Sequence, residues 1–270
     1  MRLINRKPGR VLAIVLAALP FVAVALAYTI GSEMRLAVNP QDRLLPAPAT
    51  LLDTAIRTFT EAERRSGRIL LWHDTGASLF RLLSGVGIAA LLSLVLGLVI
   101  GLLPVMRGTL SNFVAVISMV PPLALLPILF IFFGLGELSK VVLIVIGTAP
   151  VMTRDLAQRV LEIPREQIIK AQTLGASSLV IALRVVLPQV LPRLIINMRL
   201  SLGTAWLFLI AAEAVASETG LGYRIFLVRR FLAMDIILIY VLWITLLAFL
   251  LDWALRALSR RAFRWLEAGL

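Results

Sequence analysis

The chain has 270 residues, 60% of them hydrophobic, and a mean hydropathy of +0.96. Soluble domains are about half apolar, and here the excess lies in long runs, which indicates an integral membrane protein. The formal net charge of +12 needs no nucleic-acid partner, because cytoplasmic segments of membrane proteins are rich in Lys and Arg. The chain has no Cys and a single histidine, His73. This excludes disulfides and thiolate metal sites and leaves little for zinc or haem.

The N-terminal residues are basic and precede an apolar run of twenty residues, 11–30. This run is long enough to cross the ~30 Å hydrocarbon layer. A signal peptide would have a shorter apolar core and a small-residue cleavage site. We therefore expect a retained first helix, with a signal peptide as the alternative.

Six spans fit the hydrophobic pattern along the chain. They cover residues 11–30, 80–103, 113–133, 140–157, 193–215 and 236–256. With the N-terminus inside, fifteen Lys and Arg residues fall in cytoplasmic segments and ten in outer segments, six of these in the long first outer segment. Long loops count less in the positive-inside rule, so both termini are expected in the cytoplasm. The chain then divides into an N-terminus with the first helix, an outer segment, a five-helix core and a cytoplasmic tail, at residues 1–30, 31–78, 79–260 and 261–270.

The outer segment carries an amphipathic pattern after the sequence Leu45-Pro-Ala-Pro-Ala-Thr50. Its two prolines favour extended backbone, and Thr50 can cap a helix that follows. Apolar residues then recur at helical spacing, opposite charged ones, over residues 51–68. The pattern predicts a helix at the outer surface of the membrane, either packed without a partner or docking one.

The third span contains Pro121, Pro122 and Pro127. Prolines in a spanning helix free backbone carbonyls, which neighbouring helices or a water-filled cavity must satisfy. The prolines indicate either a packing kink or a break that lines a path, as in transporters. In the second span, Arg81 is expected near the outer end, where its side chain can reach the interface.

A polar segment from Pro164 to Pro188 interrupts the hydrophobic runs. Pro164 can open a helix that continues to Leu174, and Gly175 suits a left-handed position after it. One of the two serines that follow can cap a second short helix, which is expected to end at Pro188. This corner can fill a groove on a soluble partner or lie on lipid headgroups. The surface that it would offer consists of Ala171, Leu174 and Ala176.

The fifth span carries a stripe of unusual residues about 80° wide at helical spacing. The stripe comprises Arg199, Gly203, Trp206, Ile210 and Glu213. Arg199 and Glu213 are fourteen residues apart, roughly 21 Å along a helix, so they cannot pair with each other. Each is expected either to pair with another helix or reach its nearer interface, or to line a cavity.

The polar segment resembles the EAA loop of the permease subunits of ABC importers, which reads E-A-A-x-x-x-G-x9-I-x-L-P. Ala171 matches the last Ala, and Gly175 is followed after nine residues by Val185-Val-Leu-Pro188. Ile169 and Lys170 stand where the motif has Glu and Ala. Docking is therefore expected to depend on shape and apolar contact more than on a motif salt bridge.

Further segments resemble the nitrate, taurine and aliphatic-sulfonate type of permease, and the resemblance covers residues from about 45 to 260. These segments are Leu45-Pro-Ala-Pro48, Val120-Pro-Pro-Leu-Ala-Leu-Leu-Pro127, Phe132-Phe-Gly-Leu-Gly-Glu-Leu-Ser-Lys140, Ala212-Glu213 and Gly220-Leu-Gly-Tyr223.

The resemblance implies an all-α membrane protein with the fold of a type I importer permease: six transmembrane helices and a cytoplasmic coupling helix within residues 164–188. It implies a bacterial inner-membrane complex of two permease subunits, expected as two copies of this chain, with two ATPase subunits and an external substrate-binding protein. The residues expected to couple to the ATPase are Arg165, Ile169, Lys170, Ala171, Leu174, Gly175, Ala176, Leu187 and Pro188. Those expected to line the path are Pro121, Pro122, Arg199, Trp206 and Glu213.

The sequence has no nucleophile elbow, zinc-protease motif or P-loop, so the chain is not expected to be an enzyme or to hydrolyse ATP itself. ATP and Mg²⁺ would be held by the partner ATPase, and no cofactor or metal by this chain. The expected cargo is a small anion such as taurine, an alkanesulfonate, nitrate or bicarbonate, with Arg199 as a residue that could attract it. Another small solute, a secondary transporter and a membrane-embedded enzyme are the alternatives.

Overall fold

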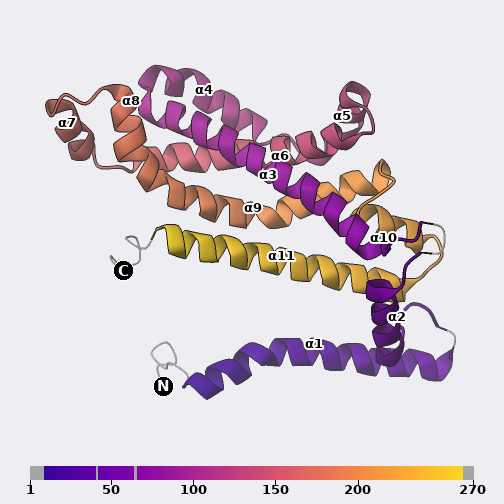
Figure 1. Ribbon diagram of the computed structural model, residues 1–270. Coiled ribbons are helices and arrows are strands. Elements are labelled where there is room, and N and C mark those ends of the chain that lie inside the picture. Colours follow the sequence, from indigo (N-terminus) through magenta and orange to yellow (C-terminus); the bar gives the residue numbers. More distant parts are fainter. Residues whose placement is uncertain (1–8, 41, 64–65, 264–270) are drawn as a thin grey trace. The chain divides into compact units, whose positions relative to one another are not determined.

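The structure is a computed structural model that describes residues 9–40, 42–63 and 66–263. Every regular element in this part of the chain is a helix (Figure 1), which confirms the all-α prediction. Within the described residues, five helices are long and apolar enough to cross a membrane, and a bent helix pair brings the number to six. The chain forms two compact units, Met1–Ile69 with Leu227–Val241, and Leu70–Phe226 with Leu242–Leu270.

In the first unit, α1 (Arg10–Val38) presents an apolar surface that the described residues of that unit leave uncovered. Its one buried side chain is Ser32, whose Oγ donates hydrogen bonds to the carbonyl oxygens of Leu45 and Pro46 at 3.0 and 3.2 Å. Tyr28 Oη donates to the same Pro46 carbonyl at 2.7 Å. These bonds hold the extended segment after α1 against the end of that helix.

The amphipathic helix α2 (Pro48–Thr60) begins three residues earlier than expected. Thr50 is not its N-cap: Ala47 occupies that position and Pro48 begins the helix, because proline has no N–H and its fixed φ suits a first helical turn. Leu52 and Ile56 remain exposed. Thr54 Oγ1 donates to Asp235 Oδ2 at 3.0 Å, which joins α2 to the first turn of α11 (Met234–Ala262).

The core of the second unit is formed by α3 (Leu70–Leu102), α6 (Glu137–Leu161) and α9 (Leu187–Val215), which pack along one another (Figure 1). Glycines allow the backbones of α3 and α6 to approach closely, as in many membrane helix pairs. A Cβ atom on Gly97 would lie 2.7 Å from Leu156 Cβ. Ser93 Oγ adds an interhelical hydrogen bond to the Ala149 carbonyl at 2.9 Å.

The predicted third span, 113–133, is not one helix. It belongs to a pair of segments, α4 (Pro104–Ile117) and η2–α5 (Pro122–Leu125 and Leu126–Phe133), that meet at 82°. Two adjacent prolines cause the break, because neither donates a helical hydrogen bond and each restricts the residue before it. The prolines therefore accompany a break between two helical segments, and a role of this break in lining a path stays a prediction.

The polar segment forms α7 (Arg165–Thr173), a glycine turn and α8 (Ser178–Ile181); residues 165–181 are called the α7–α8 corner below. Gly175 has φ +80°, as predicted for this position. The N–H groups of Gly175 and Ala176 donate to the carbonyls of Gln172 and Ala171 at 2.9 and 3.0 Å, which closes the end of α7. Ser177 caps α8 by accepting from the Val180 N–H.

The second short helix does not end at Pro188, which corrects the sequence prediction. Helix continues from Ser178 to Val215, through a π-helical turn, η3 (Ala182–Val186), in which Leu187 N–H donates to the Ala182 carbonyl. Proline in a regular helix collides with the carbonyl four residues before it. The wider π turn lies directly before Pro188 and gives that carbonyl room.

Candidate functional site

The α7–α8 corner exposes several apolar side chains, of which Leu174, beside the glycine turn, is the most exposed. Leu174 is 80% exposed and Ile169 is 55% exposed. Ala171 and Ala176 instead pack against the helix bundle together with Ile168. The predicted surface of Ala171, Leu174 and Ala176 is therefore divided: the alanines attach the corner to the bundle, and Leu174 projects from it.

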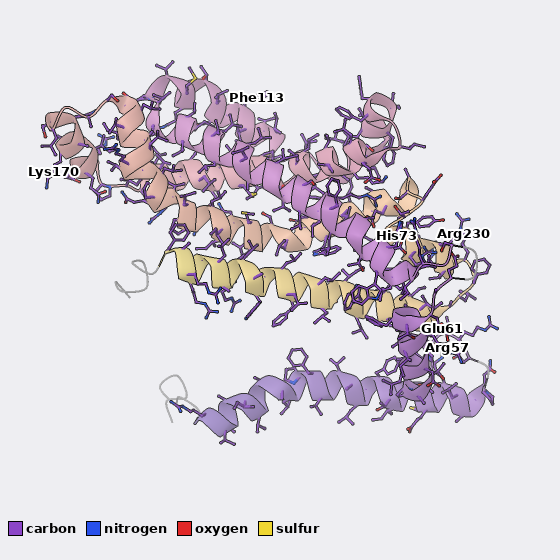
Figure 2. The ribbon with its side chains drawn as sticks, viewed as in Figure 1. Arg57, Glu61, His73, Phe113, Lys170 and Arg230 are labelled. Atoms are coloured by element: carbon purple, nitrogen blue, oxygen red, sulfur yellow. The ribbon has the colours of Figure 1, made fainter. Side chains whose placement is uncertain are left out.

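The charged residues of α7 face solvent. Arg165, Glu166 and Lys170 are exposed, and Lys170 lies at the outer edge of the corner (Figure 2). None of the three forms an ion pair with another described residue. Leu187 and Pro188 lie beyond the corner, in the first turn of α9, where Leu187 is half-buried and Pro188 exposed.

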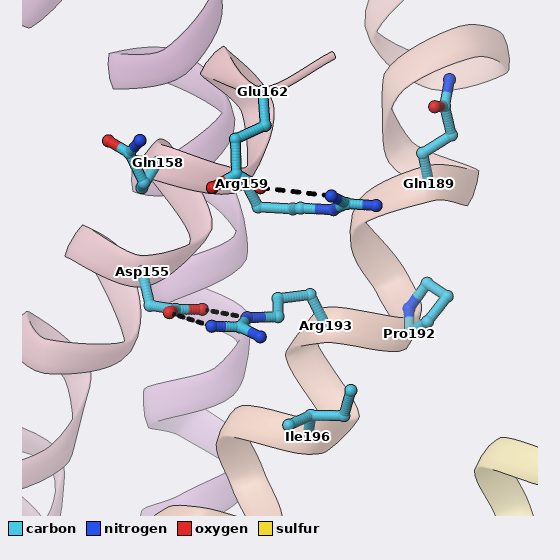
Figure 3. Close-up of a pocket in the computed structure, with 8 residues that line it drawn as sticks. All are labelled: Asp155, Gln158, Arg159, Glu162, Gln189, Pro192, Arg193 and Ile196. Atoms are coloured by element: carbon cyan, nitrogen blue, oxygen red, sulfur yellow. Dashed lines mark hydrogen bonds and ion pairs between the residues drawn. The ribbon is translucent and has the colours of Figure 1, made fainter.

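A polar groove runs between α6 and α9 and begins near the corner. Figure 3 shows its first cavity, of about 210 Å³, in which Asp155 on α6 accepts two hydrogen bonds from Arg193 on α9, at 2.6 and 2.5 Å. Asn197 Nδ2 donates to the same carboxylate at 2.8 Å. A second cavity of about 290 Å³ shares Asp155 with the first and is also lined by Asn197, Ser201 and Thr204.

This groove was not predicted from the sequence, although a signal for it is present. Arg193, Asn197, Ser201 and Thr204 recur at intervals of four, four and three residues, which places them along one face of α9. The prediction instead chose the face of the same helix that carries Arg199 and Glu213, because its residues are more unusual for a membrane span.

At the end of the second unit opposite the corner (Figure 1), Glu213 is fully buried. Its carboxylate accepts from Ser78 Oγ, Arg81 Nη1 and the Gly222 N–H at 2.8, 2.7 and 2.8 Å. Arg81 Nη1 also donates to the Thr219 carbonyl at 2.8 Å, and its Nε and Nη2 bind Glu137.

A second buried carboxylate completes this cluster. Asp74 accepts from the Gly220 N–H at 3.0 Å and from Arg224 Nε at 2.8 Å. Gly220 has φ +120°, and a Cβ there would lie 2.5 Å from the Glu213 carboxyl carbon. The loop before α10 (Leu221–Arg229) is thus fixed to both α3 and α9, and only glycine fits at its closest approach.

The Arg81 side chain is buried among partners in this structure and does not extend to the surface of the second unit. Helix α3 begins at Leu70, ten residues before the predicted start of the second span. Arg81 is therefore about 16 Å inside the helix, is 2% exposed and has buried partners. The sequence did contain a signal for this cluster. Glu137, Glu213 and Gly222 each belong to one of the short segments that resemble the permease family.

The predicted path residues of α9 do not share one surface. Arg199 pairs with Asp252 on α11, Nε to Oδ1 at 2.8 Å, and Glu213 belongs to the buried cluster. Trp206 is 4% exposed, and its indole N–H has no hydrogen-bond partner among the described residues. Arg199 and Glu213 each pair with another helix in this structure, and the path role of all three residues stays a prediction.

Pro121 and Pro122 lie at the break between α4 and η2. Met119 and Val120, immediately before them, are 74% and 37% exposed. Arg154 on α6 donates to Ser118 Oγ at 2.9 Å, which fixes the end of α4. No group of His, Asp or Glu suited to a metal ion occurs among the described residues.

The chain is similar to known transport proteins in sequence and in structure. Residues 91–264 match the family described as binding-protein-dependent transport system inner membrane component. The taurine transport system permease protein TauC of Escherichia coli is 40% identical over 196 residues, which cover 72% of this chain and 71% of that protein. The bicarbonate transport system permease protein CmpB of Synechococcus elongatus is 29% identical, with 76% of this chain and 78% of that protein covered.

A similar fold occurs in a solved structure of the MetNI methionine ABC transporter in an inward-facing conformation. The TM-score is 0.57, the identity 20%, and the match covers 71% of this chain and 96% of that chain.

Proposed function

This chain belongs to the family of binding-protein-dependent transport system inner membrane components, and on that premise we propose that it works as one of two identical permease subunits of an importer for a small anion. As a member of this family it is a multi-pass transport subunit of an ABC importer and not an enzyme. Its partners are an ATPase and a substrate-binding protein. The ATP and Mg²⁺ of the cycle would be bound by the ATPase.

The observation that carries the proposal is the exposed α7–α8 corner. A short helix fixed to the bundle by its inner face, with Leu174 at 80% exposure, has the form of a helix that enters a groove on a partner. Ile169, Leu174 and the glycine turn would provide the apolar contact, and Arg165 and Lys170 the charged rim. Movement of the ATPase would reach α9 directly, because helix continues from α8 through η3 into α9.

Two surfaces support a second permease copy. Irregular backbone at membrane depth is tolerated only where protein or water covers it, and the break before Pro121 and Pro122 is exposed in the single chain. The polar groove between α6 and α9 is likewise open along its length. We place both at the centre of a pair of permeases, where the groove and the proline break would line the path between the copies.

This arrangement also fixes the orientation that we propose. The corner lies between the fourth and fifth crossings, so it shares a side of the membrane with the N-terminus if each span crosses once. An ATPase at the corner places that side in the cytoplasm. The lysine and arginine distribution favours the same orientation.

The cargo that we propose is a small oxyanion, with taurine or an alkanesulfonate first. Relatives are named for taurine, aliphatic sulfonates and bicarbonate, which share a compact anionic oxygen group. Arg199 was expected to attract the anion, yet it already has Asp252 as counter-ion. Arg81 and Lys140, which line a cavity at the other end of the second unit, are better placed for that role.

The docking proposal is tested by native mass spectrometry of the assembly purified with its ATPase. Wild-type protein should give two copies of this chain with two ATPase subunits. Leu174→Glu should leave the pair of permeases without ATPase, because a charge at the tip cannot enter an apolar groove. The matched control is Leu135→Glu, at a leucine 65% exposed at the other end of the bundle, which should keep all four subunits. ATPase retained by Leu174→Glu would contradict docking at the corner.

A further inference from the structure

Two basic side chains are buried together at the end of the second unit opposite the α7–α8 corner. Arg81 and Lys140 are each 2% exposed. Buried cations in a membrane protein need anionic or strongly polar partners, and by default they indicate a functional site. Arg81 is bound by two carboxylates, whereas Lys140 donates its hydrogen bonds to backbone carbonyl groups.

Glu213 is the permanent counter-ion of Arg81. It is 0% exposed and is held by Ser78 and the Gly222 N–H as well as by Arg81 Nη1 at 2.7 Å. Close packing against Gly220 leaves its carboxylate no room to move. Arg81 and Glu213 therefore neutralise each other without further help.

Glu137 is a second carboxylate on the same guanidinium, but it lies on the open side. It accepts from Arg81 Nε and Nη2, while its own side chain is 55% exposed. Lys140 Nζ is 3.9 Å from Glu137 and donates to the carbonyls of Leu135 and Gly136 at 3.2 and 3.1 Å. Among the described residues, Lys140 thus has no carboxylate within hydrogen-bond distance.

A cavity of about 470 Å³ opens at this point and is lined by Arg81, Glu137 and Lys140 together with Ser217 and Thr219. Thr219 Oγ1 accepts from Arg81 Nη2 at 3.1 Å. We propose that it is an anion-binding site in which the Glu137 carboxylate occupies the place of a small oxyanion and swings aside to admit one. The ligand class is a monoanion with two or more equivalent oxygens, such as a sulfonate, a carboxylate or bicarbonate. Two oxygens of that anion would take the bonds from Arg81 Nε and Nη2, and Lys140 would face a third.

The exchange conserves charge. When Glu137 turns towards solvent, the cluster of Arg81, Lys140 and Glu213 keeps a net charge of about +1, which a monoanion restores to neutrality. Glu218, also on the cavity wall, is exposed and lowers affinity for an anion. A site that binds weakly and exchanges its ligand suits a path better than it suits storage. The inference rests on the proposed function only for the side from which the anion arrives.

The test uses the full chain in nanodiscs, with methanesulfonate as probe and dimethyl sulfone as its neutral counterpart. Glu137→Ala removes the competing carboxylate and frees two donors, so methanesulfonate should bind it at least about tenfold more tightly than wild type. Methanesulfonate should also raise the thermal midpoint of this variant, and dimethyl sulfone should not. A variant that folds only when methanesulfonate is present would equally support the site.

Two further variants separate a built site from general electrostatics. Glu218→Gln removes the same charge from the cavity wall without freeing a donor of Arg81, and it should change the affinity by less than about threefold. Lys140→Met in the Glu137→Ala background should abolish the gain. The proposal is overturned if Glu137→Ala binds no better than wild type, if dimethyl sulfone has the same effect, or if Lys140→Met leaves the gain intact. ATPase docking plays no part in this binding measurement, so its failure and the failure of the proposed importer role are distinguishable.

Discussion

At the scale of single residues, burial separates the ion pairs into two kinds. Glu213 and Arg81 are enclosed and satisfied by several neighbours. Arg199 and Asp252 retain 22% and 31% side-chain exposure. Removing one member of an enclosed pair leaves an uncompensated charge, whereas a half-exposed pair gains little over hydration.

Glu213→Gln should therefore lower the free energy of unfolding by about 3 kcal/mol, since Arg81 loses its enclosed counter-ion. Asp252→Asn, the matched control, should cost about 1 kcal/mol or less. Both values can be obtained by titration with a denaturing detergent, monitored by tryptophan fluorescence. Equal costs for the two variants would show that the Glu213 cluster does not stabilise the fold as described.

What the sequence could predict at this scale depended on local chemistry. Gly175 was predicted correctly, because a left-handed turn after a helix has a local signature. The burial of Arg81 was not predicted, and the end of the second short helix at Pro188 was predicted wrongly. The burial of Arg81 depends on helix ends and partners far away in the sequence, and the helix through Pro188 depends on a π turn that no residue type announces.

At the scale of helices, the contact between α3 and α6 depends on glycine. The Cβ of an alanine at position 97 would meet Leu156 Cβ at 2.7 Å. Gly87, on the same helix, has nothing within 4 Å of such a Cβ. Both glycines lie within α3, so they differ in the room around them and not in backbone conformation. They therefore form a matched pair for substitution.

Gly97→Ala should destabilise the protein by about 1–3 kcal/mol, because the two helices must separate to admit a methyl group. Gly87→Ala should be neutral or stabilising by up to about 1 kcal/mol, as expected for alanine in an open helical position. The same detergent titration applies to both. Loss of stability in Gly87→Ala, or none in Gly97→Ala, would contradict the close approach of α3 and α6.

The helices were predictable where a long run of apolar residues indicates a membrane span. The predicted spans at 11–30, 80–103, 140–157, 193–215 and 236–256 each fall on a long helix, with α3 and α9 beginning earlier than expected. The third span was predicted to begin at residue 113 and to be one helix. The structure has two segments from Pro104 that meet at 82°, and a hydropathy pattern does not reveal such a turn. The polar α6–α9 groove was missed because the polar face of α9 that lines it is less conspicuous than the stripe with Arg199 and Glu213.

At the scale of the whole molecule, the second unit presents two chemically different ends. The α7–α8 corner exposes apolar and basic groups, and the opposite end holds the Arg81 cluster and its cavity. The α9 helix reaches from one end to the other, and α6 runs beside it. A permease needs this connection, because ATP is hydrolysed on one side of the membrane and the cargo arrives from the other.

The most direct test is uptake of radiolabelled taurine, methanesulfonate and bicarbonate into proteoliposomes that contain this chain and its ATPase. The binding protein is added outside and ATP is trapped inside. We predict that at least one of these anions accumulates only when ATP, ATPase and binding protein are all present, and that Leu174→Glu abolishes the accumulation. Accumulation without the ATPase would identify a secondary transporter and contradict the account.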